Sequence, residues 1–277
     1  MKKTAIRLST ILVVAYLLAC LYLFVQQRSF LYHGGNKPVI EAALAAGYQR
    51  VEYTAADGQK LWGLYRPPPS ETAPMIIVFH GNAGIDNLLD DHALPLSTLP
   101  VGIFLTTYRG FDGNDGISTE AGLQQDAQAA YDFAKNQGIS THRIVLYGQS
   151  LGTGVAAYLA ALVANKMPAA GLILEAPFTR MVDMAKLRYW YMPVDWLLQD
   201  RYDTINNLAD IQAPVLIMHG EADKVIPISM GKALCNAAKE PKKCVWFPGA
   251  GHTDLYAHNA FNSVQEFVNN LTTSTAR

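Results

Sequence analysis

The sequence predicts an α/β protein built on one doubly wound, mostly parallel sheet. Beyond residue 40, short apolar runs rich in Val, Ile, Leu and aromatic residues alternate with helical stretches. The runs lack the period-2 alternation of a half-exposed strand, as expected for parallel strands that are covered on both faces. Strands that alternate with helices imply right-handed crossover connections and therefore a sheet with helices on both sides.

Composition excludes several other classes of protein. The chain has 277 residues, of which 50% are hydrophobic and 16% charged, with a formal net charge of −1. This balance excludes a disordered chain and gives no general attraction for nucleic acid. Three cysteines cannot form a disulfide-rich scaffold, and the chain has no C-x-x-C pair for a metal.

The first element is an apolar segment that predicts a transmembrane helix. Residues 8–27 contain no charged side chain. Twenty helical residues span about 30 Å, which is the thickness of the hydrocarbon core of a bilayer. We therefore expect residues 1–40 to form a hydrophobic anchor and linker, and residues 41–277 to form the α/β domain.

Three interpretations of this segment remain open. An uncleaved signal-anchor is favoured because the apolar run is longer than a usual secretory signal core. A lipoprotein signal with lipidation at Cys20 and a cleaved secretory signal are the alternatives. Lys2, Lys3 and Arg7 precede the segment, whereas Arg28 and Lys37 follow it. The excess of positive charge before the segment favours a cytoplasmic N-terminus and an exported, extracytoplasmic domain.

The α/β domain begins with a predicted hairpin, followed by six buried strands and four main helices. The hairpin strands Val51–Thr54 and Leu61–Tyr65 are joined at Asp57-Gly58, a good turn sequence. The buried strands are Met75–Phe79, Val101–Thr106, Arg143–Tyr147, Gly171–Leu174, Val215–Met218 and Val245–Phe247. The helices are Glu120–Asn136, Leu151–Ala164, Ile228–Lys239 and Leu255–Leu271.

The interval 178–206 interrupts this alternation, because it holds no strand and is rich in aromatic residues. Short helices that pack on the domain would explain it, and so would a helical lid over an apolar acyl pocket. The two interpretations are compatible. If the segment is a lid, the candidate substrate-binding residues are Tyr189, Trp190 and Trp196.

A candidate nucleophile lies between a strand and a helix. Gly148-Gln149-Ser150-Leu151-Gly152 follows the strand Arg143–Tyr147 and opens the helix Leu151–Ala164. G-x-S-x-G alone is a weak signal, but this context is that of a sharp elbow, which tolerates only small residues on either side of the serine. Such a turn presents the hydroxyl of Ser150 at the carboxyl edge of the sheet, where ligands bind.

A serine nucleophile needs a base and an acid that orients the base. His252 follows the last strand in a loop of small residues, and Asp223 follows the strand before it. The order Ser150, Asp223, His252 is the order expected for this topology. Glu175 and Glu221 are rival acids, whereas His219 is expected to be a packing residue.

Hydrolysis also needs amide donors for the oxyanion of the tetrahedral intermediate. The segment His80-Gly81-Asn82-Ala83-Gly84 follows the strand Met75–Phe79, where the first half of an oxyanion hole is expected. We assign the backbone N–H of Asn82 and that of Leu151 to this role. A glycine-rich turn without function is the alternative for the first segment.

The chain resembles the α/β-hydrolases, and more narrowly their membrane-anchored Bem46-like branch, over roughly residues 28–270. The motifs that carry the resemblance are Arg28–Tyr32, His80–Gly84, Tyr108–Phe111, Gly148–Gly152, Asp200–Asp203, Pro214–Gly220 and Gly249–His252. The resemblance implies an eight-stranded sheet and serine-hydrolase chemistry on acyl esters or thioesters, without a cofactor.

The segment 112–118 departs from the family pattern, which usually continues Gly-x-Ser-x-Gly-x-Pro after Tyr108–Phe111. This leaves the shape of the loop open, although no member of the triad lies in it. Asp112 and Asn114 are spaced like calcium ligands, but Gly116 stands where the next oxygen ligand would be, so we expect no metal site.

Cys235 and Cys244 bracket a short loop between a helix and a strand. A disulfide between them is plausible if the domain is exported, whereas both are packing residues if it is cytosolic.

The predicted function is therefore that of a membrane-anchored serine hydrolase acting on small-molecule or lipid-like acyl substrates. Two alternatives remain. A peptidase that releases N-terminal residues would need an acidic side chain to hold the amine of its substrate, for which Asp183, Asp195 and Asp200 are candidates. A membrane-tethered binding protein without catalysis is the other alternative, although binding does not require a serine at an elbow.

Overall fold

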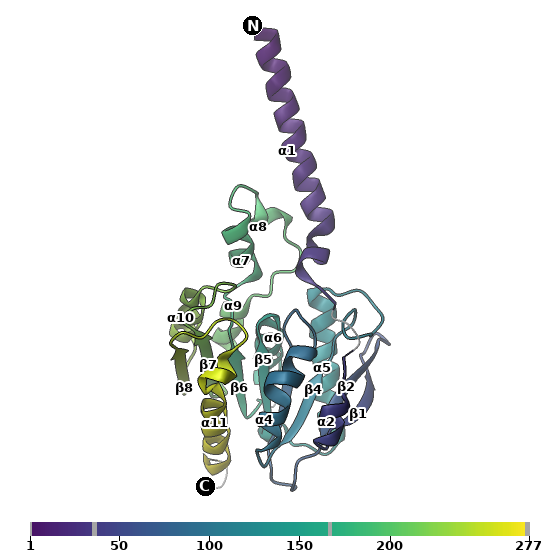
Figure 1. The fold of residues 1–277 in the computed structure, drawn as a ribbon, viewed down its shortest axis with the longest axis vertical. Helices are drawn as coiled ribbons and strands as arrows, with labels where there is room; N and C mark the ends of the chain where they lie inside the picture. Colours follow the sequence, from purple (N-terminus) through teal and green to yellow (C-terminus); the bar gives the residue numbers. More distant parts are fainter. Residues whose placement is uncertain (1, 35–37, 166–167, 275–277) are drawn as a thin grey trace.

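A computed structural model describes residues 2–34, 38–165 and 168–274. Figure 1 shows a long helix, α1 (Lys2–Leu31), that projects from one pole of an α/β domain. Among the described residues, α1 is the one helix long and apolar enough to cross a membrane. Lys37, counted above among the flanking charges, lies outside the described residues.

One eight-stranded sheet forms the centre of the domain, as the sequence predicts. The strands are β1 Gln49–Thr54, β2 Lys60–Arg66, β3 Met75–Phe79, β4 Gly102–Thr106, β5 Ile144–Gln149, β6 Gly171–Glu175, β7 Val215–Gly220 and β8 Lys242–Phe247. Their order in space is β1-β2-β4-β3-β5-β6-β7-β8. The strand β2 is antiparallel to both its neighbours, and all other pairs are parallel. The carboxyl ends of β3 and β5–β8 therefore share one edge.

Helices cover both faces of the sheet and bury two apolar layers. The helices that pack on one face are α5 Glu120–Asn136, α6 Leu151–Ala164, α9 Thr204–Asp210 and α10 Ile228–Ala237. Those on the other face are α2 Glu41–Ala45, α3 Asp86–Leu88, α4 Leu94–Ser97 and α11 Ala260–Ser274. Adjacent residues of each central strand contribute to opposite layers, as Ile77 and Val78 do in β3. This confirms the predicted two-sided burial.

Two local features differ from the sequence prediction. The single helix expected over Leu255–Leu271 is divided into a 3-10 helix, η3 (Leu255–His258), and α11. Asn259 separates them with a φ of 68°, a left-handed conformation that ends the first helix and that Asn adopts more readily than most residues. The helical turns between β3 and β4, which include a π-turn at Leu89–Ala93, were not predicted at all.

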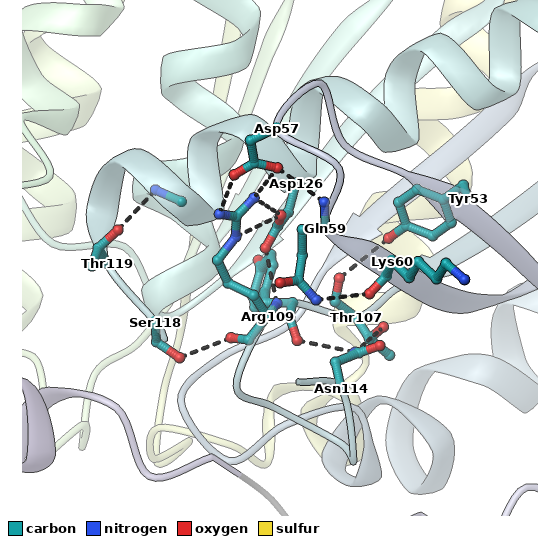
Figure 2. A network of polar contacts seen from close by, with 12 residues as sticks. Tyr53, Asp57, Gln59, Lys60, Thr107, Arg109, Asn114, Ser118, Thr119 and Asp126 are labelled. Carbon is teal, nitrogen blue, oxygen red and sulfur yellow. Dashed lines mark hydrogen bonds and ion pairs between the residues drawn. The ribbon is translucent and has the colours of Figure 1, made fainter. Parts of the chain in front are cut away.

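The loop after β4, whose sequence departs from the family pattern, is fixed by a charged network (Figure 2). The guanidinium of Arg109 binds Asp126 of α5 with N···O distances of 2.7 and 2.9 Å, and Asp57 of the β1–β2 turn at 2.6 Å. The hydroxyl of Ser118 donates to the carbonyl of Arg109 at 2.8 Å. Arg109 therefore holds the loop against helix α5 and the β1–β2 turn, and Ser118 holds the far end of the loop against Arg109.

The interval 178–206 folds into two short helices, α7 (Met181–Arg188) and α8 (Val194–Leu197). They lie beyond the carboxyl edge of the sheet, next to the lower part of α1 (Figure 1). The short helices expected in this interval are therefore present, and their role as a lid stays a prediction. Cys235 and Cys244 form a disulfide between α10 and β8.

Candidate active site

Ser150 sits at a strained elbow between β5 and α6. Its backbone φ of 50° and ψ of −116° are unfavourable for a residue with a side chain. The flanking glycines are required by close backbone contacts. A Cβ on Gly148 would lie 2.3 Å from the carbonyl oxygen of Gly152, and one on Gly152 would lie 2.1 Å from that of Phe79. The G-x-S-x-G pattern is thus a steric condition for this turn.

The structure brings Ser150, His252 and Asp223 into one chain of hydrogen bonds. The Oγ of Ser150 lies 2.9 Å from Nε2 of His252, and Nδ1 of His252 lies 2.8 Å from Oδ2 of Asp223. Asp223 follows β7 and His252 follows β8, so the parallel sheet delivers all three residues to the same edge. This geometry allows His252 to accept a proton from the serine hydroxyl.

Asp223 is held as a carboxylate by several donors. The amides of Val225 and Ile226 donate to its Oδ1 at 2.8 and 2.9 Å. His219 Nε2 lies 3.3 Å from its Oδ2 and also 2.9 Å from the carbonyl oxygen of Ile226. Burial raises the pKa of Asp223, but the hydrogen bonds from His219 and His252 outweigh it and hold this pKa far below its ordinary value. His219, expected to be a packing residue, therefore also positions the acid.

The two rival acids do not contact His252. Glu175 is fully buried, where its Oε2 accepts a hydrogen bond from the hydroxyl of Tyr147 and lies 2.8 Å from Nε2 of His92. Burial raises the pKa of Glu175, but the charge and hydrogen bond of His92 bring it below the ordinary value. Glu221 is exposed to solvent. Asp223 is therefore the acid that the geometry selects.

The two assigned oxyanion donors lie beside the nucleophile. Asn82 and Leu151 line the same cavity as Ser150. Leu151 is the first residue of α6, where amide groups have no carbonyl partner within the helix and where the helix dipole favours negative charge. The amide of Leu151 is therefore available to an oxyanion, whereas the role of the Asn82 amide stays a prediction.

A buried contact between His80 and Asp112, behind the Asn82 loop, was missed by the sequence prediction. His80 and Asp112 are both fully buried at their side chains, with His80 Nε2 3.2 Å from Asp112 Oδ2. Asp112 also accepts a hydrogen bond from the amide of Ile85 at 3.1 Å. The departure from the family pattern at Asp112 thus places a carboxylate under the oxyanion loop. In the sequence, the only signal for this contact was that Asp112 stands where the family pattern has glycine.

A second missed contact comes from the residues that follow α1. The amide of His33 donates to Oδ1 of Asn82 at 3.1 Å, and Nδ2 of Asn82 donates to Nδ1 of His33. The hydroxyls of Tyr32 and Tyr202 are hydrogen-bonded at 2.8 Å. The end of the expected linker therefore forms part of the site.

The site opens into a cavity of about 480 Å³ with a largely apolar lining. The apolar residues that line it are Leu31, Phe178, Met181, Met184, Val225 and Ile226. Tyr189, Trp190 and Trp196, predicted as substrate-binding residues, are not among the residues that line this cavity. Trp190 and Trp196 are 81% and 90% exposed, and Tyr189 is not among the lining residues. The part of the α7–α8 segment that reaches the cavity is the start of α7.

The acidic residues considered for an amine site are engaged elsewhere. Asp183 pairs with Arg180 at 3.0 Å, Asp195 with Lys186 at 2.8 Å, and Asp200 with Arg28 at 3.0 Å. No Asp or Glu is among the described residues that line the cavity. In the described part of the chain, no group of three or more His, Cys, Asp or Glu side chains could hold a metal.

The sheet order, the strained serine elbow and its carboxyl-edge position define the protein as an α/β-hydrolase. A model of the prolyl oligopeptidase family matches residues 118–275. The chain belongs to that family, and the narrower likeness to the Bem46-like branch stays a prediction.

Similar proteins agree with this class. The uncharacterized protein Rv2307c of Mycobacterium tuberculosis is 37% identical over 84% of this chain and 83% of its own length. Lysophosphatidylserine lipase ABHD12 of Danio rerio is 35% identical over 61% of this chain and 48% of that protein. The esterase PF2001 of Pyrococcus furiosus has a similar fold, with a TM-score of 0.68 at 16% identity, covering 87% of this chain and 99% of that one.

Proposed function

We propose that the protein is a serine hydrolase that cleaves carboxylic ester or thioester bonds through an acyl-enzyme. The continuous hydrogen-bonded chain from Ser150 through His252 to Asp223 supports this proposal most directly. A chain of this kind activates a serine hydroxyl at neutral pH. A protein that only bound ligands would not need it, nor the backbone strain at Ser150.

Each proposed step uses a group of this chain. His252 takes the proton from Ser150 as the hydroxyl attacks the carbonyl carbon, and Asp223 holds the imidazole in the required tautomer. The amides of Asn82 and Leu151 stabilise the tetrahedral oxyanion. His252 then gives its proton to the leaving alcohol or thiol. Water, deprotonated by His252, cleaves the acyl-enzyme and releases the acid. No cofactor takes part in this scheme.

The apolar cavity favours an acyl chain or another lipid-like group as the bound part of the substrate. Methionine and phenylalanine side chains contact such groups well but offer no hydrogen bonds. A relative named as a lysophosphatidylserine lipase is consistent with this choice. An aminopeptidase would need a buried acid for the amine of its substrate, and the lining described above includes none. We therefore favour an esterase, thioesterase or lipase.

We also propose that α1 is an uncleaved signal-anchor and that the domain lies outside the cytoplasm. The helix is long and apolar, and the positive charges of its first turns precede its uncharged segment. The disulfide between Cys235 and Cys244 supports an oxidising compartment.

Labelling with a fluorophosphonate probe tests the nucleophile. We expect Ser150→Ala to abolish labelling and to reduce the hydrolysis of p-nitrophenyl butyrate to background. Ser140→Ala is the matched control, because Ser140 is exposed and precedes β5 at the opposite edge of the sheet. Stoichiometric labelling of the Ser150→Ala variant would contradict the assignment.

A further inference from the structure

The segment between α7 and α8 carries large apolar side chains that do not line the cavity. Within residues 187–196, here called the α7–α8 tip, Leu187 is 57% exposed, Trp190 81%, Tyr191 52% and Trp196 90%. Two exposed tryptophans in one short segment are costly in water, because each forgoes the burial of a large apolar surface. Such a patch is typical of a surface that meets a partner.

The α7–α8 tip lies beside the C-terminal half of α1, where it contacts residues within the helix. The hydroxyl of Tyr16 donates to the carbonyl of Tyr191 at 3.0 Å, and the sulfur atoms of Cys20 and Met192 are 3.7 Å apart. Nearer the domain, Gln27 donates to the carbonyl of Leu197 at 3.1 Å. The three contacts are spread along α1 from Tyr16 to Gln27, in the half of the helix nearer the domain.

These contacts fix the depth of the tip if α1 spans a bilayer. Tyr16 lies about 16 Å along the helix from Gln27, at about 1.5 Å per residue. Even a helix tilted by about 40° would place Tyr16 about 12 Å below the level of Gln27. Gln27 is the last residue before Arg28, the first charge after the apolar segment. A chain segment that touches Tyr16 is therefore well below the membrane surface.

We propose that the α7–α8 tip inserts into the same leaflet of the bilayer that the C-terminal half of α1 occupies. The proposal rests on the proposed membrane location of α1. The occupant of the exposed aromatic surface is lipid, because that surface continues the exposed apolar surface of α1, including Leu17, Leu18 and Leu21. Tryptophan and tyrosine are the residues that favour the boundary between head groups and acyl chains.

The charges of the tip are compatible with this position. Lys186 and Asp195 neutralise each other in an ion pair of 2.8 Å between α7 and α8. Arg188 is exposed, and the long side chain of an arginine can reach the head groups from a shallow depth. The domain would thus be attached to the membrane at two points, and α7, which leads into the tip, also lines the cavity through Met181 and Met184.

Fluorescence of the full-length chain in vesicles tests the proposal. The chain has four tryptophans, and the other two, Trp62 and Trp246, lie on strands β2 and β8. In phosphatidylcholine vesicles with brominated acyl chains, we expect strong quenching relative to unbrominated vesicles. The double variant Trp190→Phe and Trp196→Phe should lose most of this quenching, whereas the control Trp246→Phe should keep it.

Each outcome has a defined meaning. Equal quenching of the wild type and the double variant would overturn the insertion of the tip, provided that the vesicles retain the chain in alkaline carbonate. The membrane anchor would then still stand. Release of the wild-type chain by carbonate would overturn both the anchor and the tip. Fluorophosphonate labelling of the same vesicles reports on Ser150 separately, so failure of the proposed hydrolase activity is distinguishable from failure of insertion.

Discussion

The carboxylate of Asp223 couples the site to the stability of the domain. Its folded-state pKa lies below the ordinary value of about 3.9. The contribution of Asp223 to stability is therefore fully present above about pH 4 and is lost as the pH falls below that value toward the folded-state pKa. The same donors that orient the acid for His252 thus also stabilise the fold at neutral pH.

We predict that Asp223→Asn lowers the free energy of unfolding at pH 7 and that the deficit narrows below about pH 4. The asparagine cannot become an anion, so it lacks the pH-dependent part of the stabilisation. It also donates where the carboxylate accepted, which favours the wrong tautomer of His252 and lowers kcat by about 10⁴-fold, as known for a serine protease.

Urea unfolding at several pH values and esterase kinetics measure these two effects. Asp210→Asn is the matched control, because Asp210 is exposed at the end of α9. A deficit that stays constant between pH 7 and pH 3 would contradict the linkage.

His33 is the second residue with a specific consequence. Its two hydrogen bonds to the side chain of Asn82 hold one half of the assigned oxyanion hole. We predict that His33→Ala, which removes the bond made by its ring, lowers kcat about 2- to 10-fold, the equivalent of one neutral hydrogen bond. KM should change less, because the bond supports a group that acts in the transition state.

Steady-state hydrolysis of p-nitrophenyl butyrate gives both parameters. His142→Ala is the control, since His142 is exposed at the opposite edge of the sheet. A rise in KM with unchanged kcat would mean that His33 contacts substrate and does not position Asn82.

The site residues differ in how far the sequence could predict them. Ser150, Asp223 and His252 each follow a recognisable strand, so topology alone places them at one edge. The pair His80–Asp112 and the contact from His33 depend on side-chain packing between distant segments, which no local pattern encodes. Aromatic composition also could not show that Trp190 and Trp196 are exposed and lie outside the cavity lining, because it does not report which way a side chain faces.

At the scale of elements, the strongly apolar strands and the amphipathic helices were the easiest to predict. The strand Met75–Phe79 and the helices Glu120–Asn136 and Leu151–Ala164 have the predicted bounds. The helical turns at 86–97 were missed because they are short and lack a clear period. The break at Asn259 depends on one backbone angle, which hydrophobic periodicity does not report.

The disulfide closes a short connection between α10 and β8. We predict one reactive thiol, that of Cys20, in denaturant without reductant, and three after reduction. The double variant Cys235→Ser and Cys244→Ser should lose about 2–3 kcal/mol of stability, because the crosslink restricts a short loop in the unfolded chain.

Thiol titration and urea unfolding check these values, with Cys20→Ser as the control that leaves the crosslink intact. Three reactive thiols in the unreduced chain would contradict the crosslink, and with it one support for the exported domain.

The whole molecule is polarised along its length. The helix α1 leaves the domain at the pole that holds the catalytic edge, whereas α11 ends at the opposite pole (Figure 1). Residues at the end of α1 also enter the domain, since Leu31 and His33 line the cavity and Tyr32 is buried. The predicted division near residue 40 therefore does not separate the anchor from the site.

This continuity between α1 and the cavity wall has a kinetic consequence. If α1 lies in a bilayer and the substrate is a lipid ester, as proposed above, the catalytic edge stays at the membrane through successive turnovers and the search for substrate takes place in two dimensions. Turnover then follows the mole fraction of ester within the membrane and not the amount of ester per volume of buffer. Diluting such vesicles with buffer at constant lipid composition would leave the rate per enzyme unchanged.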